Sequence, residues 1–262
     1  MTRSQWLGML SSVKSARCLD LLAVALCAQA GACIGGTETG NPPVQAELSY
    51  TAYSSMPSSI SVREPSSQAV VESAWLDLDS VSLIRAGSCA QVEPNALAVP
   101  ALGIGDHAAG EHNATVFFVE PGNYCALELP FTLAPPGQVR NGVPPELARH
   151  SIMLAGALSD GTPFTLLSAA TPRVRLSADS DSFEISPNAA RTLIVFDVAE
   201  WLADLDWATA TRVDGELRIS ADDNPALLAR FESNLARGIA LYRDADGDGK
   251  LDELPVRLAH GE

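Results

Sequence analysis

Short segments with the composition of β-strands follow one another along most of this chain, and turn residues separate them. They do not alternate regularly with helical segments, which argues against a parallel α/β sheet. Many short strands with turn signals between them are typical of a sandwich. We therefore predict a mainly β protein, an antiparallel β-sandwich with two short helices. The predicted strands span residues 45–53, 74–84, 115–119, 124–133, 151–158, 163–167, 174–176, 183–185, 192–196, 217–219 and 239–242.

In two places, a turn segment short enough for a β-hairpin separates one predicted strand from the next. The first turn runs from Glu120 to Asn123 (EPGN) and the second from Ser159 to Thr162 (SDGT). Glycine, proline, aspartate and asparagine are favoured in such turns. We expect each of the two strand pairs to form a β-hairpin.

Two helices are expected among the strands. Asp197 is placed to cap a helix over residues 198–205, with an acidic residue three positions later as in a capping box. Asn224 is placed to cap a second helix, with Pro225 at its first position. Both helices carry an apolar stripe that can face the core.

Composition and charge limit the class of protein further. The 262 residues are 47% apolar and 19% charged, as in globular proteins, and residues 44–258 are expected to form a single domain. The formal net charge is −15. Nucleic acids and anionic membrane surfaces bind basic patches, so this acidity argues against both as partners.

The first 32 residues have the organisation of an export signal. Arg3, Lys14 and Arg17 form a positive region, and an apolar run over residues 21–30 follows them. That run is too short to span a bilayer. Small residues then lead to Cys33. We predict a signal peptide over residues 1–32 and an oxidising destination for the mature protein.

Cys33 and the residues around it resemble a bacterial lipoprotein precursor. The resemblance implies that Cys33 is lipidated and becomes the mature N-terminus. The departure from the pattern is Ala30, where leucine is usual, and Ala30-x-Ala32 also suits ordinary signal peptidase. Secretion as a free protein is therefore the alternative.

Residues 33–43 are rich in glycine and proline and are expected to be a flexible tether. Within them the sequence GTETGNP at residues 36–42 resembles uncharacterised myxobacterial envelope lipoproteins, and the acidic loop near the C-terminus adds to the resemblance more loosely. It implies an outer membrane lipoprotein on the periplasmic or surface face and supplies no activity.

Cys89 and Cys125 are the cysteines that follow Cys33. Two cysteines in an exported domain are most simply paired in one disulfide, which should stabilise the fold by about 4 kcal/mol. Two buried free thiols are the alternative.

An acidic loop near the C-terminus (DADGDGKLDE, residues 244–253) has the spacing of a calcium-binding loop. Aspartates occupy loop positions 1, 3, 5 and 9, and a glycine occupies position 6. A complete EF-hand has glutamate at position 12, where this chain has Pro255, so we expect weak structural binding with a Kd on the order of 10⁻⁴ to 10⁻³ M. An acidic turn without an ion is the alternative. The predicted ligands are Asp244, Asp246, Asp248, Lys250 (through its carbonyl oxygen), Asp252 and Glu253.

Other candidate sites are weaker. His107 and His112 lie five residues apart across a glycine, which matches no zinc motif, so we expect solvated loop residues. Gly103 and Gly105 are interpreted as part of the same loop. Asp77 alternates with Asp79 on one predicted strand, most simply on a solvated face.

These observations lead to two hypotheses about function. The first is an exported, membrane-anchored lipoprotein with a structural calcium loop and a non-enzymatic role in the envelope or in binding a protein or glycan. The second is a polysaccharide hydrolase with an unassigned carboxylate pair. No catalytic residue is assigned, because the sequence contains no signature of nucleophilic catalysis.

Overall fold

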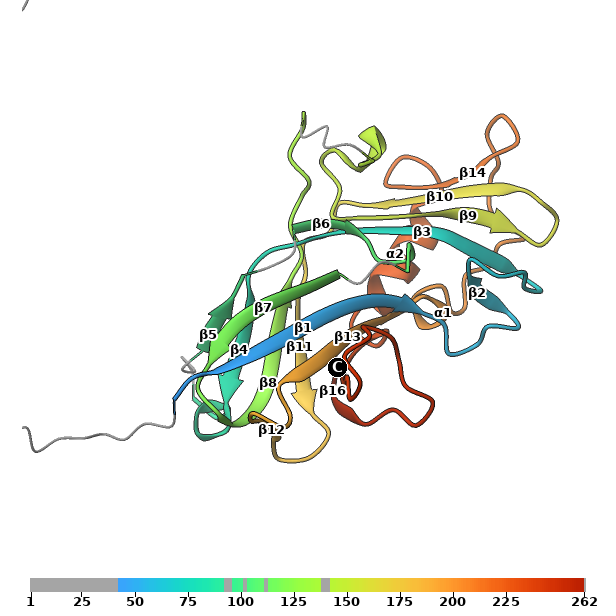
Figure 1. Cartoon of the computed structure of the whole chain (residues 1–262). Helices are drawn as coiled ribbons and strands as arrows, with labels where there is room; N and C mark the ends of the chain where they lie inside the picture. The colour runs from blue at the N-terminus through green and yellow to red at the C-terminus, as the bar shows by residue number, and fades with distance from the viewer. Residues whose placement is uncertain (1–41, 92–95, 101–102, 111–112, 138–141, 262) are drawn as a thin grey trace, which may run out of the picture. The chain divides into compact units, whose positions relative to one another are not determined.

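Within the residues that the structure describes, the larger of two β-sheets carries ten strands. The structure is a computed structural model that describes residues 42–91, 96–100, 103–110, 113–137 and 142–261 (Figure 1). The predicted signal peptide and Cys33 lie outside the described residues. The strands of the larger sheet are β1 (Val44–Tyr53), β4 (Val81–Arg85), β5 (Ala96–Val99), β7 (Asn113–Val119), β8 (Gly122–Pro130), β11 (Arg173–Ala178), β12 (Phe183–Ile185), β13 (Arg191–Asp197), β15 (Ile239–Arg243) and β16 (Arg257–Gly261).

Their order is β5-β4-β8-β11-β16-β15-β13-β1-β7, and β12 pairs with β8 outside this path. The smaller sheet has the order β14-β10-β9-β3-β2, and β6 pairs with β3. Its strands are β2 (Ile60–Val62), β3 (Ala69–Leu78), β6 (Gly103–Asp106), β9 (Ile152–Leu158), β10 (Pro163–Ser168) and β14 (Leu217–Ile219).

Buried side chains from the two sheets form one hydrophobic cluster. Leu48 and Ile194 of the larger sheet belong to it together with Leu76 and Leu154 of the smaller sheet. Most strand pairs are antiparallel, whereas β1 with β13, β2 with β3 and β10 with β14 are parallel. The prediction of a mainly β sandwich with two α-helices is confirmed.

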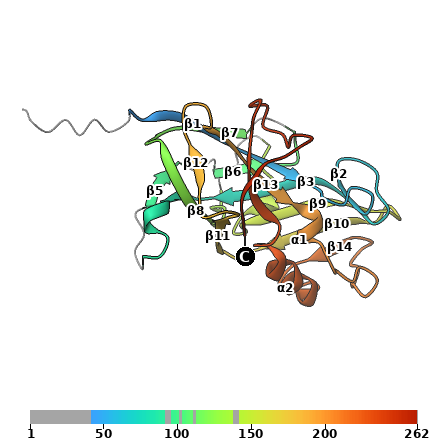
Figure 2. The ribbon, with the colours of Figure 1, turned by 90° about the horizontal axis from the view of Figure 1, so that it is seen from below.

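The helices are α1 (Val198–Trp201) and α2 (Pro225–Asn234), and two 3-10 turns, η1 (Ala86–Ser88) and η2 (Pro145–Leu147), complete the described elements. Figure 2 shows α1 and α2 next to each other near β10 and β14. Asp197 caps α1 as predicted, because its side chain accepts the N–H groups of Ala199 and Glu200. The helix ends at Trp201, one turn earlier than residue 205.

Asn224 and Pro225 hold the N-cap and first positions of α2, as predicted, but the expected side-chain cap is absent. Asn224 adopts a left-handed conformation with φ of 56°, and its side chain makes no capping hydrogen bond. Instead it accepts the N–H of Thr211 and donates to the carbonyl oxygens of Thr211 and Arg218. The asparagine therefore ties α2 to the preceding loop and strand rather than to its own first turn.

The predicted strand over residues 74–84 is two strands in different sheets. β3 ends at Leu78 and β4 begins at Val81, and the chain turns between them at Asp79 and Ser80. Asp79 accepts the N–H of Ser80 at 2.7 Å, which fixes the turn. Because Leu78 and Val81 are both buried, the apolar pattern continues across the turn and hides it from the sequence.

One of the two predicted hairpins is present. β9 and β10 pair across the SDGT turn, where the N–H of Leu158 donates to the carbonyl of Thr162 at 2.8 Å. The β7–β8 hairpin is wrong: β7 pairs with β1, and β8 pairs with β4, β11 and β12. The EPGN turn reverses the chain, but the partners of both strands come from elsewhere in the sequence.

Candidate metal site

Three aspartates converge in the loop between β15 and β16, drawn in red in Figure 1. Asp244 directly follows β15, and Asp246 and Asp248 come next along the loop. Each offers one carboxylate oxygen, and the three oxygens lie within 4.8 Å of one another. The described residues contain no other such group of histidine, cysteine, aspartate or glutamate. The cluster has the dimensions to hold a metal ion.

Hydrogen bonds to backbone N–H groups fix this arrangement. Asp244 accepts from Gly247 at 2.8 Å and from Gly249 at 3.2 Å, one bond to each carboxylate oxygen. Asp246 accepts the N–H of Asp248 at 3.1 Å. Gly247 and Gly249 have φ of 76° and 71°, a conformation that side chains disfavour. The DGDG spacing therefore shapes the loop as well as supplying carboxylates.

Asp244 is the buried member of the cluster, with 2% of the residue exposed. Burial raises the pKa of its carboxyl group, and the negative charges of Asp246 and Asp248 add to this effect. The N–H groups of Gly247 and Gly249 act in the opposite direction. A cation bound here would lower the pKa of Asp244 again, because a positive charge stabilises the carboxylate form.

The other predicted ligands are less closely placed. Asp252 is half-buried and Glu253 is exposed, and neither belongs to the three-carboxylate cluster. Lys250 donates its N–H to Asp248 at 2.8 Å, and its ammonium group lies 3.9 Å from the other oxygen of Asp248. Metal ligation by these three residues stays a prediction.

A cavity of about 520 Å³ lies beside the loop. One wall comes from the start of β1, one from the segment before β13 and one from the end of β15. Sequence reasoning missed this cavity, because its walls come together only through the pairing of β13 with β1 and β15. Its polar lining includes Gln45, Glu47, Asn188, Arg191, Arg243 and Asp244.

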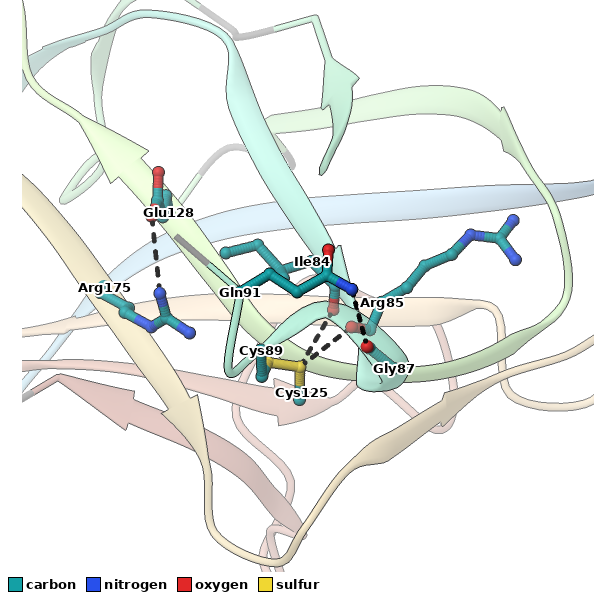
Figure 3. Close-up of a disulfide and its surroundings, with 8 residues drawn as sticks. All are labelled: Ile84, Arg85, Gly87, Cys89, Gln91, Cys125, Glu128 and Arg175. Carbon is teal, nitrogen blue, oxygen red and sulfur yellow. Dashed lines mark hydrogen bonds and ion pairs between the residues drawn. A yellow bond between two sulfur atoms is a disulfide. The ribbon is translucent and has the colours of Figure 1, made fainter. Parts of the chain in front are cut away.

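The disulfide is present as predicted. Cys89 follows η1, Cys125 lies in β8, and their Cα atoms are 6.2 Å apart, within the usual range. Figure 3 shows the bond beneath Ile84, near the ion pair of Arg175 with Glu128. Ile84 packs with both cysteines in a small hydrophobic cluster. The disulfide therefore joins the segment after η1 to β8, and β4 and β8 are already neighbours in the larger sheet.

His107 is not a solvated loop residue, as its sequence context predicted. Only 2% of it is exposed, and its ring lies 5.9 Å from that of Tyr50 and 5.3 Å from that of Phe196. Both of its ring nitrogens are buried without a hydrogen-bond partner among the described residues. Burial lowers its pKa to about 4, with a smaller opposing effect from the backbone of Tyr50. Gly103 and Gly105 likewise belong to strand β6, and His112 lies outside the described residues.

The expectation that Asp77 lies on a solvated strand face is wrong. It is 5% exposed rather than solvated, and burial, followed by the charge of Asp79, raises its pKa. Asp79 is exposed at the turn after β3. Neither carboxyl lines the cavity beside the acidic loop. This pair therefore gives the hydrolase hypothesis no support.

Comparisons with known proteins identify no family. No family model and no curated protein matches the chain. Among solved structures, MbnP from Methylosinus trichosporium is similar with a TM-score of 0.42 and 11% sequence identity, over 83% of this chain and 99% of that chain. A likeness this distant carries no argument about ligand or activity. Within the described residues, no helix has the length and apolar character needed to cross a bilayer.

Proposed function

We propose that this protein is a calcium-stabilised β-sandwich whose acidic loop binds one Ca²⁺ ion. The observation that carries the proposal is the convergence of Asp244, Asp246 and Asp248, with Asp244 buried. Three carboxylates at this distance repel one another without a cation. A divalent ion removes the repulsion and compensates the burial of Asp244.

The donor set favours calcium over other metals. All three ligands are carboxylate oxygens, which suit hard cations, and the cluster contains no imidazole or thiolate of the kind that transition metals select. Calcium accepts six to eight oxygens in a flexible geometry, so backbone carbonyls and water can complete the shell. Magnesium demands a near-ideal octahedron and is less suited to a loop with so few fixed ligands.

The ion would act on stability rather than on chemistry. The loop connects β15 to β16, and β16 lies between β11 and β15 in the larger sheet. Ordering the loop restricts how β16 can enter the sheet. The calcium ion would therefore hold an inner strand in register.

The proposed setting is the bacterial envelope, with the domain anchored through lipidated Cys33 and serving in envelope structure or in binding a protein or glycan. The lipoprotein-like signal before Cys33 supports this setting. Extracellular calcium modules bind with a Kd on the order of 10⁻⁴ to 10⁻³ M, and weak binding suffices where calcium is plentiful.

Thermal unfolding of the protein without its signal peptide tests the calcium proposal. At 10 mM CaCl₂ a site with this affinity adds about 1.4 to 2.7 kcal/mol, which corresponds to a rise in Tm of roughly 3–10 °C over EGTA. MgCl₂ at the same concentration should give a smaller shift. Equal melting curves in calcium and EGTA would refute the proposal.

A pair of matched variants assigns the shift to the loop. Asp246→Asn with Asp248→Asn should abolish the calcium-dependent rise in Tm. Asp181→Asn with Asp222→Asn changes the net charge equally at two exposed positions outside the loop and should keep the rise. A rise that survives the first pair would place the ion elsewhere.

A further inference from the structure

The cavity beside the acidic loop has the size and lining of a ligand site. Its volume of about 520 Å³ falls in the range of small-molecule pockets. Glutamine, asparagine, arginine and carboxylate side chains line it, and none of the described lining residues is aromatic. Such a lining suits a small molecule with many hydrogen-bonding groups and an ionised group.

Arg243 gives this cavity a positive charge, and it forms no ion pair with any described residue. Its guanidinium group donates to the carbonyl oxygens of Ala189 and, at 2.8 Å, of Glu184. No described carboxylate lies within ion-pair distance of it. Since an arginine stays charged in proteins, a half-buried guanidinium held only by carbonyl dipoles leaves the cavity wall attractive to an anion.

Arg191 connects the cavity wall to the acidic loop. Its Nη1 donates to the carbonyl of Asp246 at 3.4 Å, and its own carbonyl accepts the N–H of Asp244 at 3.3 Å. A Cβ added at Gly247 would lie 2.6–2.9 Å from the Arg191 side chain, so the loop backbone packs directly against it. Ordering of the loop therefore fixes the position of this second guanidinium group.

We propose that this cavity binds a small hydroxyl-rich organic acid of the sugar-acid type, and that Ca²⁺ in the loop strengthens the binding. The carboxylate of the ligand pairs with Arg191 and Arg243, and its hydroxyl groups bond to the amides of Gln45 and Asn188. This inference rests on the proposed calcium site and assigns that site a ligand.

The dependence on calcium follows from charge. Without an ion, Glu47 and the three clustered aspartates outnumber Arg191 and Arg243, so net negative charge nearby weakens the attraction of Arg243 for an anion. Glu47 also lies 3.7 Å from Nε of Arg191. A divalent cation held by Asp244, Asp246 and Asp248 cancels two of their three negative charges, so the wall and the loop together become neutral. An anion then gains attraction at short range, where screening by salt is weak.

Isothermal titration calorimetry tests the proposal. D-glucuronate is titrated into the protein without its signal peptide, and D-glucose serves as the uncharged control. Titrations are run in CaCl₂ and in EGTA, and the same free calcium is kept in cell and syringe, because glucuronate itself binds calcium weakly. We expect glucuronate to bind in calcium, at least tenfold weaker binding in EGTA, and no measurable binding of glucose. Absence of glucuronate binding, equal binding of glucose, or equal binding in calcium and EGTA would each overturn it.

The variant Arg243→Gln separates this inference from the calcium proposal. It should lower glucuronate affinity at least tenfold and keep the calcium-dependent rise in Tm. Arg212→Gln removes an exposed arginine that pairs with Asp160 outside this cavity and should bind glucuronate like the parent protein. If calcium raises Tm but glucuronate does not bind, the ligand assignment fails and the calcium site stands. If calcium has no effect on Tm, both fail.

Discussion

Replacing His107 by phenylalanine should remove the part of this fold's acid sensitivity that comes from the burial of an imidazole. The imidazole is buried between the rings of Tyr50 and Phe196, and its nitrogens have no hydrogen-bond partner among the described residues. The environment therefore accepts an aromatic ring and disfavours a charged one. Phenylalanine keeps the ring and cannot be protonated.

The pKa values give the size and the sign of the effect. The pKa of His107 is lowered to about 4 in the fold, against about 6.5 in the unfolded chain. Below pH 6.5 the unfolded chain takes up a proton that the folded protein refuses, so stability falls as the pH falls. One histidine with these values costs about 2 kcal/mol between pH 8 and pH 5, and about 3 kcal/mol by pH 4.

Urea unfolding at pH 8.0, 6.5 and 5.0 measures this directly. At pH 8.0 the variant His107→Phe should lie within about 3 kcal/mol of the parent protein, because the phenyl ring is larger than imidazole and overpacking a core costs about 1–3 kcal/mol. At pH 5.0 the variant should be more stable relative to the parent by about 2 kcal/mol than it is at pH 8.0. His150→Gln, at a histidine that contacts the carbonyl of Glu146 near the surface, should show no such change.

The difference between variant and parent is the decisive quantity, since other groups titrate in both proteins. If that difference stays constant between pH 8.0 and pH 5.0, His107 is either hydrated or hydrogen-bonded in the folded state, and the reasoning from burial is wrong.

Two further predictions concern the cysteines. Replacing Cys89 and Cys125 together by alanine should lower the free energy of unfolding by about 4 kcal/mol, because the bond closes a loop across a sequence separation of 36 residues; a loss below 1 kcal/mol in urea unfolding would contradict this. Growing expressing cells with radiolabelled palmitate should label the protein, and Cys33→Ala should abolish the label. A label that persists in this variant, or a parent protein without label, would argue against the lipid anchor.

Strand positions were predictable from the sequence where apolar residues alternate and turn residues end the segment. β9, β10 and β13 are examples, because the turn chemistry and the pattern agree there. β16 was missed: Arg257–Gly261 has little strand character of its own and is held by β11 and β15 on its two sides. The order of strands in the sheets depends on such distant pairings, which local patterns do not contain.

The candidate metal site was likewise predictable from the sequence only in part. The spacing of three aspartates within five residues brings them together locally, so the sequence alone located the cluster. Arg191 and Arg243 carry no local signal, because the register of β13 with β15 places their strand ends together. The burial of His107 was equally hidden, since a glycine-rich context suggests solvent and only the rings of distant strands enclose it.

The position of β16 has a consequence for how the chain acquires its structure. This strand separates β11 from β15 in the larger sheet, and β1 bonds to β13 across a sequence separation of 145 residues. The sheet therefore has no large local portion that can form early while the rest of the polypeptide is still missing. Contacts of such long range make folding slow, in milliseconds to seconds, and a late event in biosynthesis. A protein truncated before residue 257 should remain open at the centre of its larger sheet, not merely shortened at an edge.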